Sequence, residues 1–207
     1  MNPIAVVAAK RTAVGAFGGS LSTVSAVNLG VTVIQQLLKD TNLPVEQISE
    51  VIFGQVLTAG QGQNVARQTS ILSGLPYSCP AMTINFVCGS GLKAVALGAR
   101  SIAVGDSEIV IAGGQESMSQ SGHIILGSRE GYRMGDAMLI DTLLKDGLID
   151  AFEEYHMGIT AENLAKKYNI SREEQDIFAA ESQRRASKAR AEGRFKDEIV
   201  PVLVSNR

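Results

Sequence analysis

Short apolar runs alternate with amphipathic stretches along the first 115 residues of the chain. Four runs are apolar nearly throughout, as in strands buried on both faces; they cover residues 4–9, 50–57, 81–87 and 107–114. Between them, apolar residues recur at helical spacing in residues 27–38, 65–72 and 92–102. Strands and helices in alternation predict a mostly parallel sheet with helices on its faces. In such sheets, ligands lie beyond the carboxyl ends of the strands.

The pattern changes after about residue 115. A stretch rich in glycine and serine predicts loops, and two helices are expected at residues 160–168 and 172–192. Ser171 and Glu174 form the sequence signature of a capping box, and Gly193 is a natural helix stop. Residues 198–204 are interpreted as a strand. Because that strand would reach the end of the chain without a partner, we expect part of the fold to lie outside these 207 residues.

Composition indicates a globular protein, with 45% hydrophobic and 19% charged residues. A net charge of −2 gives no general attraction to nucleic acids or anionic membranes, and the basic stretch at residues 184–196 is interpreted as a solvated helix face. No run approaches the roughly 18 apolar residues of a membrane span. Two cysteines are too few for a disulfide framework, and two isolated histidines indicate no metal site. We therefore expect a cytoplasmic protein with no nucleic-acid or membrane partner.

Cys88 lies in the segment "NFVCGSG", between an apolar run and a predicted helix. Gly89 and Gly91 permit a sharp turn from strand to helix. Backbone N–H groups at a helix start favour a thiolate and can hold a developing oxyanion. The same residue could instead be a buried free cysteine, which is common in proteins. Cys79, between Ser78 and Pro80, has no comparable setting and is expected to be inert.

Six segments in chain order resemble sequence blocks of the thiolase family. They are "GQVLTAGQGQNVARQ" (54–68), "NFVCGSGLKAV" (85–95), "GGQESMS" (113–119), "YHMGITAENLAKKY" (155–168), "SREEQDIFAAESQ" (171–183) and "GRFKDEIVPV" (193–202). The resemblance spans essentially the whole chain and fits the acetyl-CoA acetyltransferase branch best. It implies a thiolase-like α/β fold, half of a layered α/β/α architecture with a mostly parallel mixed sheet. It also implies two incomplete domains: an N-terminal α/β domain at 1–118, without its last strand, and part of an α+β loop domain at 119–207.

The resemblance further implies the condensation of two acetyl-CoA to acetoacetyl-CoA and free CoA, or the reverse thiolysis. Cys88 would be the nucleophile that carries the acyl group as a thioester, with its backbone N–H in the oxyanion hole. His156 and Met157 would bind substrate. Coenzyme A would serve as the substrate carrier, with no metal or prosthetic group. A dimer or tetramer of identical chains is expected.

By the same resemblance, the base and a second cysteine belong to a C-terminal half outside this chain. The chain by itself is therefore expected to be inactive, and poorly stable unless a second chain completes it. Asn64 and Arg67 are expected to fix loops or an interface, and Glu116 to support loops as a buried, paired carboxylate.

Several alternatives remain open at this level. A 3-ketoacyl-CoA thiolase of fatty-acid oxidation would differ in the size of its acyl pocket. A non-catalytic fragment would serve only to complete a partner chain. A ketoacyl synthase fits the quoted segments less well, and a cysteine hydrolase lacks a histidine in a suitable context.

Overall fold

The structure is a computed structural model that describes residues 3–204, and the chain divides into two compact units. The first unit runs to Gly147 and resumes at Val200, and the second is Leu148–Ile199. Each unit is described by itself. The domain boundary expected between residues 118 and 119 stays a prediction.

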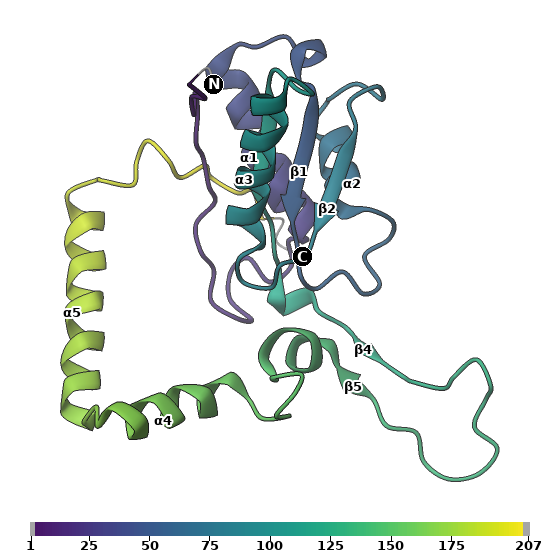
Figure 1. Ribbon diagram of the computed structural model, residues 1–207, viewed down its shortest axis with the longest axis vertical. Coiled ribbons are helices and arrows are strands. Elements are labelled where there is room, and N and C mark those ends of the chain that lie inside the picture. The colour runs from purple at the N-terminus through teal and green to yellow at the C-terminus, as the bar shows by residue number, and fades with distance from the viewer. Residues whose placement is uncertain (1–2, 205–207) are drawn as a thin grey trace. The chain divides into compact units, whose positions relative to one another are not determined.

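A parallel three-stranded sheet forms the centre of the first unit (Figure 1). Its strands are β1 (Glu50–Gly54), β2 (Ala81–Ile84) and β3 (Val110–Gly114), in the order β2-β1-β3. β1 is the middle strand and is buried from its second residue onward, which explains its continuous apolar sequence. The predicted parallel sheet is thereby confirmed.

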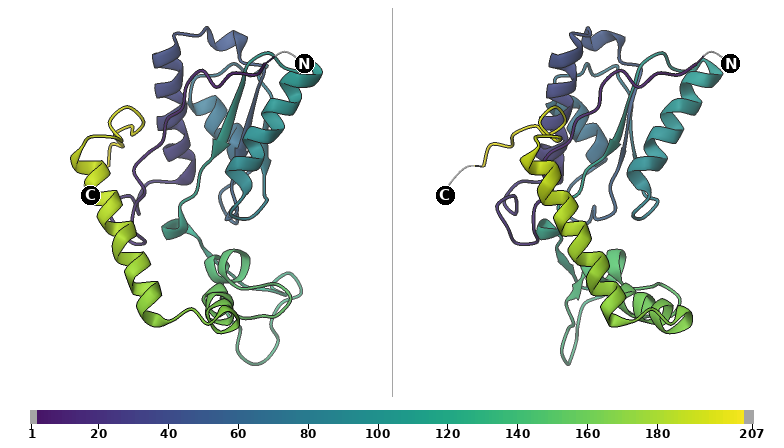
Figure 2. Two further views of the ribbon diagram at one scale, coloured as in Figure 1. Left: turned by 60° about the vertical axis from the view of Figure 1, so that its left-hand side comes forward. Right: turned by 90° about the vertical axis from the view of Figure 1, so that its left-hand side faces the viewer.

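Helices cover both faces of this sheet. Figure 2 shows α1 (Ala26–Thr41) and α2 (Val65–Leu72) on one face and α3 (Ser90–Val104) on the other. Ile34 of α1 is fully buried in a core that also holds Phe53 of β1 and Ile111 of β3. This α/β/α layering confirms the fold class expected from the sequence.

Small residues let α3 lie close to the sheet. A Cβ atom on Gly98 would come within 2.9 Å of Val110 Cγ1. The segment Val87–Val104 also has a mean hydropathy of 1.3 over 18 residues, the length and composition of a membrane span. The expectation that no run approaches that length is therefore wrong. The packing of Ala94 and Gly98 against the sheet accounts for the apolar character of one face of the helix.

Two of the predicted strands are wrong for this structure. Residues 4–9 form no strand, and the single long-range backbone hydrogen bond of residues 198–204 runs from the Val200 N–H to the Arg11 carbonyl at 2.8 Å. Neither segment lies in register with a neighbouring strand, and a strand is stabilised by its partners rather than by its own sequence.

The first unit ends in irregular structure, as the glycine- and serine-rich sequence predicts. A short 3-10 helix (Met118–Gln120) precedes β4 (His123–Ile124), which pairs antiparallel with β5 (Ile140–Asp141). The connection between β4 and β5 is largely exposed. A five-residue π-helix, Leu144–Leu148, follows β5.

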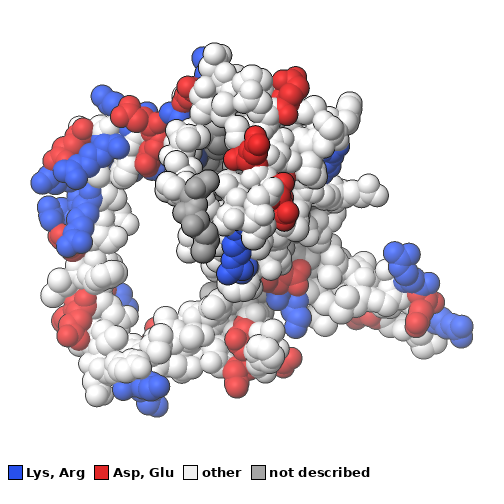
Figure 3. All heavy atoms as spheres, turned by 45° about the horizontal axis from the view of Figure 1, so that its top comes forward, with Lys and Arg blue, Asp and Glu red and all other residues white. Residues whose placement is uncertain are grey.

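The second unit contains α4 (Met157–Tyr168) and α5 (Arg172–Ala191), which confirms both predicted helices. The Ser171 hydroxyl accepts from the Glu174 N–H at 3.2 Å, and the Glu174 carboxylate accepts from the Ser171 N–H at 2.8 Å. The predicted capping box is therefore present. Along α5, basic and acidic side chains lie side by side (Figure 3), with Glu181 paired to Arg184 and Arg185. This mixture confirms a solvated helix face for the α5 part of residues 184–196.

Candidate active site

Three glycines bring the start of α3 onto the carboxyl edge of the sheet. A Cβ atom on Gly54, the last residue of β1, would lie 2.5 Å from Ser90 Cβ. A Cβ atom on Gly114, the last residue of β3, would lie 3.3 Å from Gly91 Cα. No larger residue fits at Gly54 without displacing backbone. The turn that carries Cys88 is thereby held where parallel sheets place their ligands.

That turn is closed by its own hydrogen bonds. The Asn85 carboxamide oxygen accepts from the Val87 N–H at 2.9 Å. The Ser90 hydroxyl accepts from the Phe86 N–H at 2.8 Å and donates to the Val87 carbonyl at 2.6 Å. Val87 has a φ of +48°, a left-handed conformation that is strained for a β-branched residue. Strain of this kind persists only where surrounding bonds impose it, and it gathers at functional sites.

Cys88 is exposed, so the alternative of a buried cysteine is wrong for this residue. Its backbone N–H makes no hydrogen bond within residues 3–204. Gly89 caps α3 without a side-chain acceptor, and the first turn of the helix holds no acidic residue. The N–H groups of Gly89 and Ser90 already donate to the carbonyls of Phe86 and Val87, each at 3.1 Å, so a negative charge that develops beside Cys88 would meet the free Cys88 N–H and no opposing carboxylate in that turn.

No side chain of the described chain forms a hydrogen bond with the Cys88 thiol. In the first turn of α3, the Nζ of Lys93 lies 5.5 Å from the ring centroid of Phe86. The turn therefore exposes and orients the predicted nucleophile. None of the hydrogen bonds within residues 3–204 supplies that nucleophile with a general base.

Cys79 has the opposite environment. It is 3% exposed and packs in the hydrophobic core, where burial raises the pKa of its thiol. Arg67 holds the loop around it by donating hydrogen bonds to the carbonyls of Tyr77, at 2.8 Å, and Cys79. The expected inertness of Cys79 and the loop-fixing role of Arg67 both agree with these contacts.

Asn64 fixes the start of α2 to β2. Its side-chain oxygen accepts from the Arg67 N–H at 3.1 Å and from the Thr83 hydroxyl at 2.8 Å. Its amide nitrogen donates to the Ala81 carbonyl at 2.9 Å. Asn64 therefore caps α2 and connects it to β2. This agrees with the structural role expected for it, which is to fix a loop or an interface.

Glu116 holds the loop after β1. Its Oε2 accepts hydrogen bonds from the N–H groups of Val56 at 2.8 Å and Leu57 at 3.3 Å. Its Oε1 is buried and has no partner among the described residues. Burial raises the pKa of the carboxyl, against the opposing effect of the neighbouring N–H groups. The carboxylate is thus paired with backbone donors rather than with a cation.

A network of buried side-chain amides lies at the carboxyl edge of the sheet, and the sequence pattern did not predict it. The Gln115 amide donates to Gln55 Oε1 at 2.9 Å and accepts from the Thr69 hydroxyl at 2.7 Å. Gln55 in turn donates to Gln61 Oε1 at 2.7 Å. The Thr69–Gln115 bond links positions 46 apart and the Gln55–Gln115 bond links positions 60 apart. The network thus joins α2 to the residues that follow β1 and β3. The signal in the sequence is a glutamine directly after each of two buried strands.

His156 and Met157 lie in the second unit, at the start of α4. The His156 side chain is the N-cap, with Nδ1 accepting from the Gly158 N–H at 2.9 Å, and Met157 is 47% exposed. The capping bond uses one ring nitrogen and leaves the other available. Contact of either residue with substrate stays a prediction.

Comparison with known proteins gives one consistent result. Residues 4–207 match the family profile described as "Thiolase, N-terminal domain". An acetyl-CoA acetyltransferase of Chromobacterium violaceum is 61% identical over 204 residues, which are 99% of this chain and 52% of that protein. One from Cupriavidus necator is 58% identical over 207 residues (100% and 53%), and the cytosolic acetyl-CoA acetyltransferase of Mus musculus is 56% identical over 206 (100% and 52%). The chain spans about half the length of these curated relatives.

Proposed function

Since the chain belongs to the thiolase family, we propose that it is the N-terminal part of an acetyl-CoA C-acetyltransferase. The observation that carries this proposal is an exposed Cys88 beside the uncapped start of α3, inside the segment that matches the family. The complete protein would condense two acetyl-CoA to acetoacetyl-CoA and CoA, or catalyse the reverse thiolysis.

Two chemical steps follow from this assignment. The Cys88 thiolate attacks the carbonyl carbon of acetyl-CoA, a carbon–sulfur bond forms, and the CoA thiolate leaves and takes up a proton. A second acetyl-CoA then loses an α-proton to a base, and its carbanion attacks the acetyl-cysteine. A carbon–carbon bond forms, the thioester bond to Cys88 breaks, and the thiolate is restored. CoA carries both acyl groups, so no metal or prosthetic group enters either step.

The residues of this chain take limited roles in that sequence. Cys88 supplies the nucleophile, and its N–H together with the start of α3 stabilises the oxyanion. His156 and Met157 bind substrate. The base and a second cysteine would come from the part of the complete protein that this chain does not match, and the chain alone is expected to be inactive.

Mass spectrometry of the intact protein tests the proposal. The purified chain would be incubated with acetyl-CoA alone, and again after joining it to the unmatched part of the Chromobacterium violaceum relative. We expect one acetyl group on Cys88 in the joined protein and none in the chain alone. Cys88→Ala should abolish the adduct, whereas Cys79→Ala should leave it in place. A well-folded joined protein without an adduct, or with one at Cys79, would contradict the assignment.

The names of the relatives favour a short acyl chain over the longer-chain 3-ketoacyl-CoA thiolase. Competition between acetoacetyl-CoA and a long-chain 3-ketoacyl-CoA in the joined protein separates the two. A cytoplasmic location is part of the proposal. It is supported by the two free cysteines and by the word "cytosolic" in the names of the mouse and rat relatives, and cell fractionation tests it.

We also propose that the complete protein is a dimer or tetramer of identical chains. β2 is an edge strand of the sheet, and it exposes Met82, with Tyr77 exposed in the preceding loop. An edge strand with exposed apolar side chains is suited to pair with a second copy. Sedimentation of the joined protein measures its oligomeric state. Met82→Lys is expected to shift that state toward the monomer. An unsubstituted joined protein that sediments as a monomer would contradict the proposal.

A further inference from the structure

A lysine side chain lies over the turn that carries Cys88. Lys93 is in the first turn of α3, and its N–H donates to the Gly89 carbonyl at 2.9 Å. Residues four apart on a helix lie on the same face, so Lys93 is the neighbour of the residue that follows Cys88. Side chains of a helix tilt toward its N-terminus. The Lys93 side chain therefore extends over the Cys88 turn rather than away from it.

The ring of Phe86 holds the Lys93 amine at this turn. Lys93 Nζ lies 5.5 Å from the centroid of the ring, within the range of a cation–π contact. The ring itself lies against the turn, since a Cβ atom on Gly89 would come within 3.0 Å of Phe86 Cδ1. Phe86 and Gly89 are on the two sides of Cys88 in the chain. The amine, the ring and the exposed thiol thus belong to one turn.

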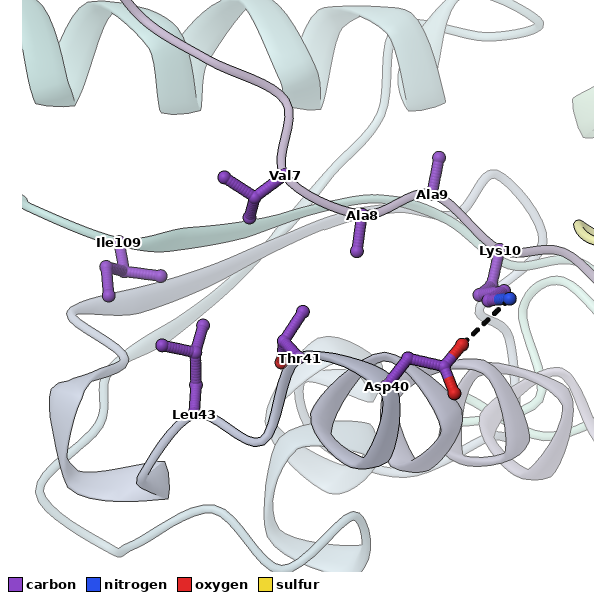
Figure 4. A pocket seen from close by; sticks show the side chains of 8 residues that line it. All are labelled: Val7, Ala8, Ala9, Lys10, Asp40, Thr41, Leu43 and Ile109. Atoms are coloured by element: carbon purple, nitrogen blue, oxygen red, sulfur yellow. Dashed lines mark ion pairs between the residues drawn. The ribbon is translucent and has the colours of Figure 1, made fainter.

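Lys93 differs from the ion-paired lysine of the same unit. Lys10 Nζ lies 2.8 Å from Asp40 Oδ2 beside a surface pocket (Figure 4). Within residues 3–204, no carboxylate forms an ion pair with Lys93. A neighbouring carboxylate stabilises the ammonium form of a lysine, whereas a lysine attacks a carbonyl carbon as the neutral amine. Of these two lysines, Lys93 is the one that no carboxylate holds in its charged form.

The other nucleophile of the turn is already engaged. The Ser90 hydroxyl accepts from the Phe86 N–H at 2.8 Å and donates to the Val87 carbonyl at 2.6 Å, and Ser90 is only 5% exposed. An acyl group on that oxygen would remove the donor of the second bond. Within the turn, an acyl group on Cys88 therefore has the Lys93 amine as its available acceptor.

We propose that Lys93 is an acetylation site that receives its acetyl group from acetyl-Cys88. The neutral amine attacks the carbonyl carbon of the thioester, a carbon–nitrogen bond forms and the carbon–sulfur bond breaks. The nitrogen gives up one proton to solvent and the sulfur leaves as the thiolate, so the products are N-acetyl-Lys93 and free Cys88. The inference rests on the proposed function only for the acetyl group on Cys88.

The transfer has two consequences for the turn. An amide is more stable than a thioester, so the acetyl group does not return to Cys88. Acetylation also removes the positive charge of Lys93 and with it the contact to the Phe86 ring. In the complete protein, Lys93 competes with the second acetyl-CoA for the same acetyl-cysteine. Acetyl-Lys93 is therefore expected to accumulate as a slow by-product of the acetyl-cysteine.

Peptide mapping by mass spectrometry of the joined protein tests the transfer after incubation with acetyl-CoA. Neutral hydroxylamine removes acetyl groups from thioesters and leaves them on amides, so it separates Cys88 from Lys93. Lys39 is the control, because it is exposed in the last turn of α1, which leads into the start of β1 at the opposite edge of the sheet (Figure 1). We expect a hydroxylamine-resistant acetyl group to form on Lys93 at least about 10-fold faster than on Lys39, since a nucleophile within the turn reacts intramolecularly. Equal rates, or no acetyl group on Lys93, would overturn the proposal.

Cys88→Ala separates transfer from direct attack of acetyl-CoA on the lysine. Acetylation of Lys93 should fall at least about 10-fold in this variant, because the intramolecular donor is lost, while that of Lys39 stays constant. Far-UV circular dichroism checks that the variant folds, and in a variant that fails this check Cys88→Ser takes its place. Acetylation of Lys93 that is undiminished without the thiol would overturn the proposal.

Two further variants test the geometry of the turn. Phe86→Leu removes the ring that holds the amine and should slow the transfer about 3-fold. Lys93→Arg keeps the charge but supplies no neutral amine, so it should form no resistant acetyl group at position 93 and should prolong the lifetime of acetyl-Cys88. A lifetime that is unchanged in Lys93→Arg would contradict transfer to this residue.

A small acetyl thioester, S-acetyl-N-acetylcysteamine, separates this proposal from the enzyme assignment. It can acetylate the exposed Cys88 of the chain alone by thioester exchange, without a base from the unmatched part. A resistant acetyl group on Lys93 that requires Cys88 would support the transfer, even if acetyl-CoA gave no adduct in the joined protein and the enzyme assignment failed. Acetyl-Cys88 that forms in the joined protein while Lys93 stays unmodified in both experiments would overturn the transfer and leave the enzyme assignment standing.

Discussion

Each α-helix of the first unit buries at least three residues, whereas α4 and α5 of the second unit bury none. The first group packs on a sheet whose middle strand is almost wholly enclosed. The second group depends on side-chain caps and on ion pairs such as that of Glu181 with Arg184. The helices of the two units are therefore stabilised by different physical terms, by burial in the first unit and by local polar contacts in the second.

The contrast carries a lesson about α5. Ile177 and Phe178 are 70% and 78% exposed on a 20-residue helix with no buried position. Capping and exposed ion pairs contribute about 1 kcal/mol or less each, which is little for a helix of that length. The second unit is thus expected to be the less stable of the two in the chain alone.

Truncation of the core should give the largest effect. Ile34→Ala removes a fully buried side chain and should lower the free energy of unfolding by about 2–5 kcal/mol. Ile177→Ala, the matched change on α5, should change it by less than about 0.5 kcal/mol. Urea unfolding followed by circular dichroism measures both, and equal losses would contradict the comparison.

The close contact between β1 and α3 should give the next largest effect. In Gly54→Ala, the new methyl group would lie 2.6 Å from the Ser90 backbone carbon, so the start of α3 must move. We expect a loss of about 1–3 kcal/mol in the free energy of unfolding, as for other overpacked sites. Gly122→Ala, where the methyl group meets nothing within 4 Å, is the control. A Gly54→Ala protein as stable as this control would show that the contact is not tight.

Loss of a cap should matter mainly in the second unit. Ser171→Ala removes the acceptor for the Glu174 N–H and should destabilise α5 by about 1 kcal/mol. Amide hydrogen exchange across α5 should accelerate while the exchange of β1 stays constant. Accelerated exchange in β1 would mean that the two units unfold together.

Acid should weaken α5 through Glu181. Hydrogen bonds from Arg184 and Arg185 lower the pKa of the Glu181 carboxyl to about 2, below its usual 4.5. A lowered folded pKa stabilises α5 above the unfolded value, and this contribution is lost as the pH falls from about 4.5 toward 2. Exchange of α5 amides should therefore speed up over that interval beyond the effect in Glu181→Gln. Glu116 has the opposite sign, because burial raises its pKa, so its protonation on acidification favours the folded first unit.

Much of the first unit follows from apolar spacing alone. The sequence predicts α2 with both of its ends, as well as the position of Cys88 between a strand and a helix, because both depend on local patterns. Residues 4–9 and 198–204 have equally apolar, strand-like sequences but do not form strands. A strand is stabilised only when another strand pairs with it.

The remaining features depend on contacts between distant residues. The Gln55–Gln115 bond joins positions 60 apart, and the contacts of Gly54 and Gly114 with α3 exist only once the sheet has formed. The cap made by His156 was missed for a different reason, since histidine is not among the preferred N-cap residues.

Because one cysteine is exposed and the other is buried, thiol labelling of this chain can measure how often its core opens. A thiol reagent meets Cys88 at the surface at once, while Cys79 reacts only when the core around Ile34 and Phe53 separates. The first mole of label per mole of protein therefore counts the molecules whose α3 turn is displayed. The rate at which Cys79 takes up the second label measures the rarer event in which the sheet and its helices separate. This measurement needs no engineered probe.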